Sequence, residues 1–227
     1  DDLPGSVLDA ILERARHHLT RASPASPLPG ALVGLAFFES SLRTKFGFSA
    51  AASRLGMTTI APDVREGHHG GPPESLHDTL RTLAGYVDIV VVRSGKPALE
   101  MVRCVPKRVA FINGGDGGPH REHPTQALID LFAIEGIAGS VADLHITVLG
   151  DLEMRAARSL LRILQDREPA RLSLVGLTGQ RPDCAVSPER DSELSEVVST
   201  TDVLYAVGIP HGVKDIGRRN HLAEFGI

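Results

Sequence analysis

The sequence predicts an α/β protein with two domains, each a parallel β-sheet layered between helices (αβα). Short apolar runs alternate along the chain with segments of helical periodicity, which is typical of repeated β-α-β units. This alternation occurs twice, before and after a stretch near residues 133 to 140. A chain of 227 residues is also long enough for two small domains that each bury a core.

The first half of the chain contains four expected strands, each a short apolar run bounded by turn residues: 31–39, 57–61, 88–93 and 108–113. Around these strands the sequence predicts helices over residues 7–20, through the alanine-rich stretch 46–52, from 75 onward and over 97–105. Capping boxes at Ser6 to Asp9 and Ser75 to Asp78 are expected to open the first and third of these helices. Residues 62–73, rich in glycine and proline, predict a mobile loop.

A helix is expected to begin at Pro124, and the second half of the chain follows it. There the predicted strands are residues 145–150, 171–176 and 202–205, with helices over 155–165 and 192–198 and an irregular polar segment over 180–191. The two halves show no sequence duplication. The predicted domains are residues 1–134 and 135–227.

Composition narrows the classes of partner. Hydrophobic residues make up 42% and charged residues 23%, which is ordinary for a soluble globular protein. The net charge of −4 and the absence of any lysine or arginine run argue against nucleic acid. No apolar segment approaches the ~20 residues that span a bilayer, and the N-terminus does not resemble a signal peptide. Two distant cysteines, Cys104 and Cys184, favour a reducing compartment, so a cytoplasmic protein is expected.

The chemistry is expected to concentrate where the first strand turns into the next helix. Ser40, Ser41, Arg43 and Thr44 follow the strand directly. A helix N-terminus supplies unbonded backbone N–H groups and positive potential, and hydroxyls and a guanidinium beside it complete an anion site. A plainer alternative is that a serine caps the helix and Arg43 is a solvated surface residue.

Three segments resemble the aspartate and ornithine transcarbamylase family. F-F-E-S-S-L-R-T-K, residues 37–45, is similar to the family's carbamoyl-phosphate signature F-x-E-x-S-T-R-T-R, with Leu42 where the family has threonine. H-P-T-Q-A-L-I-D-L, residues 123–131, is similar to H-P-T-Q-A-L-x-D-L. V-L-G-D-L-E-M-R, residues 148–155, resembles the family's G-D-L-x-x-x-R with one residue deleted. The resemblance is strongest over residues 36–54, 74–93 and 112–134.

The resemblance implies a role for each matching residue. The phosphate would be held by Ser41, Arg43 and Thr44, and the carbonyl oxygen would be polarised by Thr44, Arg93 and His123. Gln126 would hold the carbamoyl amide, and either Arg155 or Arg158 would grip a carboxylate of the amino acid; as an alternative, both arginines could be solvated helix residues. Glu39 could orient Arg43 or form an interdomain contact.

The implied activity is transfer of the carbamoyl group of carbamoyl phosphate to an amino acid amine, with L-aspartate the favoured acceptor, as in pyrimidine biosynthesis. The resemblance also implies a homotrimer, and no cofactor is expected. Residues 1–134 would bind carbamoyl phosphate, and residues 135–227 would bind the amino acid. The second domain lacks family motifs near its C-terminus, and one explanation is that its C-terminal part is absent from the sequence.

Three departures favour an alternative, a catalytically impaired subunit that binds ligand or partner proteins without transfer. Leu42 lacks a phosphate-binding hydroxyl, Pro72 stands where the family has a mobile-loop lysine, and Gly208 stands where it has an arginine. His68, His69 or Arg65 could replace that lysine.

Two further alternatives are not favoured. A nucleotide-binding protein would need G-x-G-x-x-G or a P-loop, and the chain has neither. A metal site built from His68, His69, His120 and His123 would lack the cysteine or acidic ligands that usually accompany such spacings. No metal is expected.

Overall fold

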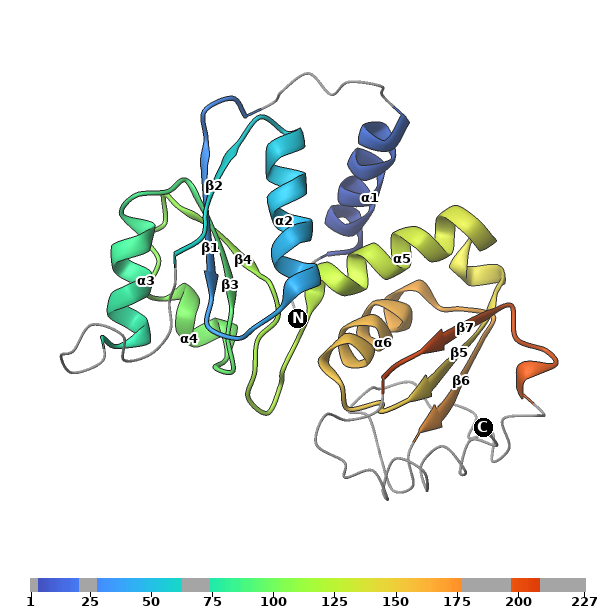
Figure 1. Ribbon diagram of the computed structural model, residues 1–227. Coiled ribbons are helices and arrows are strands. Elements are labelled where there is room, and N and C mark those ends of the chain that lie inside the picture. Colours follow the sequence, from blue (N-terminus) through green and yellow to red (C-terminus); the bar gives the residue numbers. More distant parts are fainter. Residues whose placement is uncertain (1–3, 21–27, 63–73, 177–196, 209–227) are drawn as a thin grey trace. The chain divides into compact units, whose positions relative to one another are not determined.

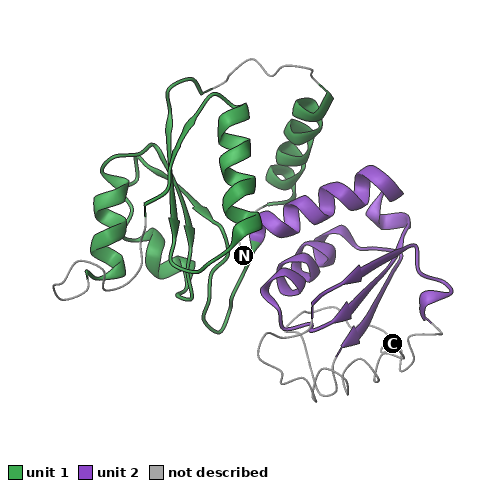
Figure 2. Cartoon of the chain, in the orientation of Figure 1, with its two compact units in different colours: residues 1–123 green, residues 124–227 purple. Residues whose placement is uncertain are grey.

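The computed structural model describes residues 4–20, 28–62, 74–176 and 197–208 (Figure 1). The chain divides into two compact units, residues 1–123 and 124–227 (Figure 2). Each unit contains one β-sheet, and every strand pair in the described part of both sheets is parallel. The predicted fold class is therefore confirmed.

The sheet of the first unit has the strand order β2-β1-β3-β4. The strands are β1 (Leu32–Phe37), β2 (Thr58–Ile60), β3 (Ile89–Arg93) and β4 (Ala110–Asn113), close to their predicted positions. Phe37 pairs with Arg93, and Val92 pairs with Asn113. The carboxyl ends of β1, β3 and β4 therefore lie together at one edge, where parallel sheets bind ligands.

Helices cover both faces of this sheet, which explains why its central strands are almost wholly apolar. Helix α2 (Leu42–Arg54) packs on one face through Ala52 against a cluster that includes Leu35. On the other face, α3 (Leu76–Ala84) and α4 (Ala98–Val102) bury Leu80 and Met101 in a second cluster. The two clusters give this unit a core on each side of its sheet.

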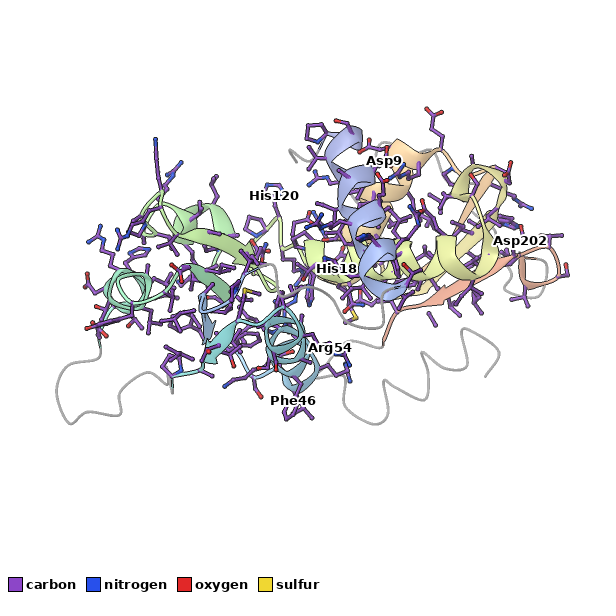
Figure 3. The ribbon with its side chains drawn as sticks, turned by 90° about the horizontal axis from the view of Figure 1, so that it is seen from above. Asp9, His18, Phe46, Arg54, His120 and Asp202 are labelled. Atoms are coloured by element: carbon purple, nitrogen blue, oxygen red, sulfur yellow. The ribbon has the colours of Figure 1, made fainter. Side chains whose placement is uncertain are left out.

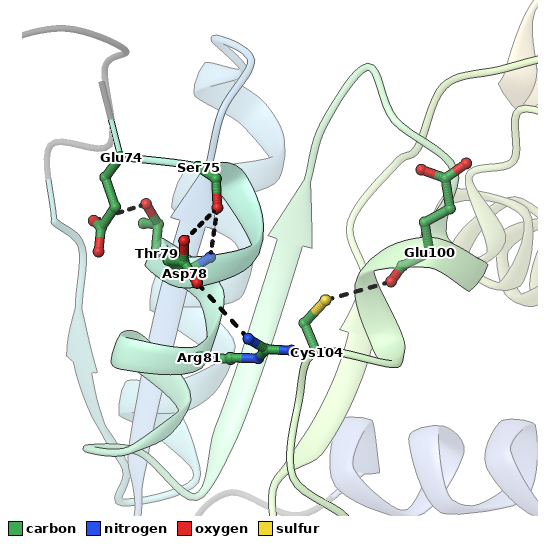
Figure 4. Close-up of polar contacts among 7 residues, drawn as sticks. All are labelled: Glu74, Ser75, Asp78, Thr79, Arg81, Glu100 and Cys104. Atoms are coloured by element: carbon green, nitrogen blue, oxygen red, sulfur yellow. Dashed lines mark hydrogen bonds and ion pairs between the residues drawn. The ribbon is translucent and has the colours of Figure 1, made fainter. Parts of the chain in front are cut away.

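The cap predicted at Ser75 is confirmed. Ser75 is the N-cap of α3, and its Oγ accepts a hydrogen bond from the Asp78 backbone N–H at 3.1 Å (Figure 4). The box predicted at Ser6 is wrong, because α1 (Gly5–Thr20) already includes Ser6. The carbonyl of Pro4 accepts the N–H groups of Val7 and Leu8, so the helix begins before the serine.

The sheet of the second unit has the order β6-β5-β7, with β5 (His145–Gly150) in the centre and β6 (Arg171–Gly176) and β7 (Val203–Ala206) beside it. Helix α6 (Arg155–Arg167) buries Ala157, Leu160, Leu161 and Leu164. It packs against α5 (Pro124–Ala138) and the short 3₁₀ helix η1 (Val141–Asp143). The three strands match the predicted ones to within a residue.

Helix α5 extends to Ala138, so the residues expected to join the domains are mostly its last turns. Ile134 is buried on this extension, which keeps the helix packed, and Gly139 follows at φ +97°, a conformation that ends a helix. The predicted irregular segment 180–191, most of the predicted loop 62–73 and most of the predicted helix 192–198 lie outside the described residues. No helix in the described ranges is long and apolar enough to cross a membrane.

Candidate anion-binding site

The candidate site is built at the carboxyl edge of the first sheet, where β1 and β3 end side by side. After β1 the chain stays attached to β3 for one more residue, because the Phe38 N–H donates to the Arg93 carbonyl at 2.8 Å. The turn then passes through Glu39 and Ser40 into α2. This register brings the start of α2 to the same edge as the side chain of Arg93.

Ser41 is the N-cap of α2, in an extended conformation with φ −156° and ψ 99°. Its hydroxyl forms no capping bond to the helix backbone in the described structure. It donates instead to the Thr44 Oγ1 at 2.9 Å, which places two hydroxyls together over the first turn. The first N–H groups of a helix have no partner within the helix, so this turn offers backbone and side-chain donors to an anion. Ser41 is therefore the N-cap by position, but its hydroxyl does not bond to the helix backbone.

Arg43 is exposed beside this turn, and the described ranges contain no ion pair for its guanidinium. Leu42, the first residue of α2, is 73% exposed, and Phe46 one turn later is 67% exposed. Phe46 and Arg54 project from α2 at different points along it (Figure 3). A cation and two hydroxyls at the positive end of a helix form an arrangement that can bind a phosphate group.

Arg93 and His123 lie close together at the same edge. The Arg93 Nη1 lies 3.1 Å from the Gly114 carbonyl oxygen and 3.3 Å from the His123 Nε2. A guanidinium only donates, so in this contact Nε2 is the acceptor and the proton of the neutral ring is on Nδ1. His123 is buried, with 8% of its surface exposed, directly before the proline that begins α5.

A buried aspartate that the sequence interpretation missed organises the loop leading to His123. The Asp116 carboxylate accepts hydrogen bonds from the backbone N–H of Ala98 at 2.7 Å and of Glu122 at 2.5 Å. It therefore joins the start of α4 to the residue before His123. Gly117 lies so close to the Gly95 carbonyl that a Cβ there would overlap it, so this loop and the turn after β3 are packed backbone to backbone. The only sequence signal was an aspartate among glycines.

Gln126 and Arg155 belong to the second unit. Gln126 lies in the first turn of α5, and its Nε2 donates to the Asp130 Oδ1 at 2.9 Å. Arg155 is the first residue of α6, after Met154 as N-cap. It follows the carboxyl end of β5, where ligands bind in parallel sheets. Arg158 lies one turn further along α6.

Gly208 follows β7 at the same edge of the second sheet. A Cβ on Gly208 would meet only the Met154 Sδ among the described atoms, at 4.0 Å, so there is room for a side chain. Gly150, at the end of β5, is at φ +117° and lies against the Val207 carbonyl. The start of α6 and the end of β7 are therefore close neighbours.

The residues considered for the mobile loop, Arg65, His68, His69 and Pro72, lie outside the described residues. The described part of the chain contains no group of three or more His, Cys, Asp or Glu that could hold a metal ion.

The chain is an α/β protein of two parallel-sheet units. Hydroxyls, guanidinium groups and a histidine lie at the carboxyl edge of the first sheet, which makes that edge a candidate anion-binding corner. Comparison with known proteins identifies its family. Residues 1–136 match the family described as "Aspartate/ornithine carbamoyltransferase, carbamoyl-P binding domain". The chain belongs to the aspartate/ornithine carbamoyltransferase family, as the sequence predicted.

Similar proteins of known identity are aspartate carbamoyltransferases. The catalytic subunit from Korarchaeum cryptofilum is 34% identical over 204 residues, which are 87% of this chain and 68% of that protein. The catalytic subunit from Hyperthermus butylicus is 37% identical over 192 residues, 80% of this chain and 60% of that protein. The chain thus spans about 60 to 70% of the length of these relatives.

Solved structures give the same result. The catalytic subunit of M. jannaschii aspartate transcarbamoylase has a TM-score of 0.76 and 26% identity, covering 96% of this chain and 75% of that one. Trypanosoma cruzi aspartate transcarbamoylase in complex with carbamoyl phosphate and aspartate has a TM-score of 0.72 and 26% identity, covering 97% and 73%. These likenesses fit the aspartate-type enzyme predicted from the sequence.

Proposed function

We propose that this protein transfers the carbamoyl group of carbamoyl phosphate to the amine of an amino acid, with L-aspartate as the acceptor. The observation that carries the proposal is the corner of the first unit, where the Ser41 and Thr44 hydroxyls at the start of α2 share a sheet edge with Arg93 and His123. A phosphate and a carbonyl oxygen on one small ligand require this combination of donors.

Each residue has a role that suits its chemistry. Ser41, Arg43, Thr44 and the first N–H groups of α2 hold the phosphate. Thr44 and Arg93 donate to the carbonyl oxygen, where negative charge grows as the tetrahedral intermediate forms, and His123 acts there through its Nδ1–H, because its Nε2 accepts from Arg93. Asp116 keeps the His123 loop in place through its two backbone hydrogen bonds. These donors are fixed before the ligand arrives, which lowers the cost of reorganisation during the reaction.

The reaction needs no covalent intermediate with the protein. The lone pair of the unprotonated amine forms a bond to the carbamoyl carbon, the bond from that carbon to the phosphate oxygen breaks, and phosphate leaves with the bonding electrons. The amine nitrogen loses one proton, which the departing phosphate accepts. Positioning of the two substrates and stabilisation of charge supply the catalysis.

The two domains predicted from the sequence take separate substrates in this proposal. Residues 1–134 bind carbamoyl phosphate, which agrees with the description of the family that matches residues 1–136. Residues 135–227 bind the amino acid, with Arg155 at the start of α6 as the carboxylate contact, and Gln126 holds the carbamoyl amide. We also propose a cytoplasmic homotrimer, with the exposed apolar side chain of Phe46 on α2 as a candidate for a subunit contact.

Two measurements test the function. Calorimetry with carbamoyl phosphate should show saturable binding, and incubation with labelled carbamoyl phosphate and aspartate should yield labelled carbamoyl-aspartate. Binding without product would favour the alternative of a transfer-deficient subunit, and the absence of any binding would refute both. Analytical ultracentrifugation tests the trimer. A measured mass equal to that of one chain, 24.2 kDa, would contradict it.

A further inference from the structure

Asp130 on α5 joins two side chains of the second unit. One carboxylate oxygen, Oδ1, accepts a hydrogen bond from the Gln126 Nε2 at 2.9 Å. The other, Oδ2, accepts one from the Tyr205 hydroxyl at 2.8 Å. Tyr205 comes from β7, 75 residues later in the chain, so the carboxylate is held from a second element.

The acceptor-only nature of an ionised carboxylate fixes the orientation of the Gln126 amide. If that amide were turned over, its carbonyl oxygen would face the Asp130 Oδ1, and two acceptors would repel each other. The amide NH₂ therefore faces Asp130, and the Gln126 Oε1 is directed away from it. An amide next to a carboxylate thus presents an acceptor, and not a donor, to its surroundings.

Tyr205 adds a second hydrogen bond to Asp130, from a different element of the fold. Amide and carboxylate groups four residues apart on a helix often form a hydrogen bond worth only ~0.2 to 0.5 kcal/mol. Here the phenol occupies the second oxygen, which limits rotation of the carboxylate. Burial, together with the Asp130 hydrogen bond and charge, raises the pKa of Tyr205 well above its ordinary value, so its hydroxyl remains a donor throughout the neutral range.

We propose that Asp130, held by Tyr205, is a positioning residue that keeps the Gln126 side chain oriented as a hydrogen-bond acceptor. The site would then select a carbamoyl group over an acetyl group. This inference rests on the proposed function, in which Gln126 meets the ligand's amide. A carbamoyl group carries an NH₂ that donates to the Gln126 Oε1, whereas an acetyl group carries a methyl that cannot. Discrimination of this kind is large when a site is built for a hydrogen bond that the analogue lacks.

Calorimetry with carbamoyl phosphate, acetyl phosphate and inorganic phosphate tests the proposal. The wild-type protein should prefer carbamoyl phosphate to acetyl phosphate. In Asp130→Asn the new amide can donate to the Gln126 Oε1 and turn the glutamine over, so carbamoyl phosphate should bind about tenfold more weakly. Affinity for acetyl phosphate and inorganic phosphate should be unchanged, because neither ligand needs the acceptor. Loss of structure alone would weaken all three ligands together.

Tyr205→Phe should reduce the preference in the same direction by a smaller factor, and it carries the test if Asp130→Asn does not fold. Tyr86→Phe is the matched control, since Tyr86 is the other tyrosine of the chain and is 71% exposed. It should leave all three affinities unchanged. A preference retained in both Asp130→Asn and Tyr205→Phe overturns the positioning role alone. If the wild-type protein binds none of the three ligands, or does not prefer carbamoyl phosphate, both the positioning role and the proposed function are overturned.

Discussion

The Arg93 guanidinium donates to the His123 Nε2 across 3.3 Å, although the two residues are 30 positions apart. Arg93 ends β3, and His123 ends the loop that Asp116 holds. The contact fixes the neutral tautomer of the histidine while the same Nη1 also reaches the Gly114 carbonyl. One cation thus orders both the histidine and the backbone after β4, so a carbonyl oxygen bound here would meet donors that are already in place.

Replacing Arg43 with alanine should remove the cation beside the first turn of α2. Hydrogen bonds to a charged group contribute roughly 1.5 to 3 kcal/mol, so phosphate affinity should fall on the order of 10- to 100-fold. Arg43 is exposed, so the variant should fold normally. Arg54→Ala, at the other end of the same helix, is the matched control and should bind phosphate normally. Equal affinity in the two variants, measured by calorimetry, would mean that the phosphate is not bound at this corner.

Leu42→Thr should improve phosphate binding. Leu42 is the first residue of α2 and is 73% exposed, so the exchange loses little buried surface and adds a hydroxyl at the helix N-terminus. A new hydrogen bond to a charged ligand contributes roughly 1.5 to 3 kcal/mol, on the order of 10- to 100-fold in affinity. Leu42→Val has the same branched shape without the hydroxyl and should show no gain. If valine and threonine raise the affinity equally, the hydroxyl is not the cause.

Gly150→Ala should destabilise the protein strongly. Gly150 has φ +117°, and a Cβ there would overlap the Val207 carbonyl oxygen. Backbone strain and displacement of β7 together should lower the free energy of unfolding by roughly 2 to 4 kcal/mol. Gly139→Ala is the control, because Gly139 also has positive φ but no atom within 4 Å of a Cβ, so it should cost only about 1 kcal/mol. Urea denaturation measures both, and similar losses would show that the Val207 contact yields to the new methyl group.

The central strands β1, β3 and β5 could be predicted from the sequence because each is a short, mostly apolar run that is largely buried on both faces. Helix ends were less predictable. Ser6 has the spacing of a capping box, but the Pro4 carbonyl accepts the first helical hydrogen bonds, so the helix begins earlier. Helix α5 continues to Ala138 because Ile134 is buried, and burial depends on neighbours that local periodicity does not reveal.

The candidate site was only partly predictable for a similar reason. His123 lies in a recognisable motif and Arg93 ends a predicted strand. Their mutual hydrogen bond, however, forms only because the strand end and the loop before α5 come together in the fold. Asp116 and Tyr205 act through hydrogen bonds to partners far along the chain or to backbone groups, and such contacts leave no local pattern. Only the four-residue spacing of Gln126 and Asp130 on an expected helix could have indicated their contact.

Alkaline pH should reveal the environment of Tyr205. Its folded-state pKa is raised above the ordinary value of 10.0, chiefly by burial and then by Asp130, so the native state holds this proton more tightly than the unfolded state. The stabilisation is fully present below pH 10 and is lost as the pH rises above 10. The free energy of unfolding should therefore fall more steeply above pH 10 in the wild type than in Tyr205→Phe.

Absorbance at 295 nm gives an independent measurement of the same effect. In folded Tyr86→Phe, Tyr205 is the only tyrosine left, and its phenolate should form at higher pH than in the urea-unfolded chain. Coincident titration curves for the folded and unfolded variant would contradict the raised pKa.

Gly208→Arg should strengthen binding of the amino acid acceptor. The family resemblance places an arginine at this position, and a Cβ on Gly208 would meet only the Met154 Sδ at 4.0 Å among the described atoms, so a side chain fits. Met154 caps α6 directly before Arg155, so the new guanidinium would begin close to the proposed carboxylate contact. A charge-assisted hydrogen bond of roughly 1.5 to 3 kcal/mol should lower the KM for aspartate on the order of 10- to 100-fold. Gly208→Met, a long uncharged side chain, is the control and should give no gain. If Gly208→Arg leaves KM unchanged while carbamoyl phosphate still binds, the acceptor's carboxylate does not lie at this edge of the second sheet, and aspartate loses its support as the acceptor.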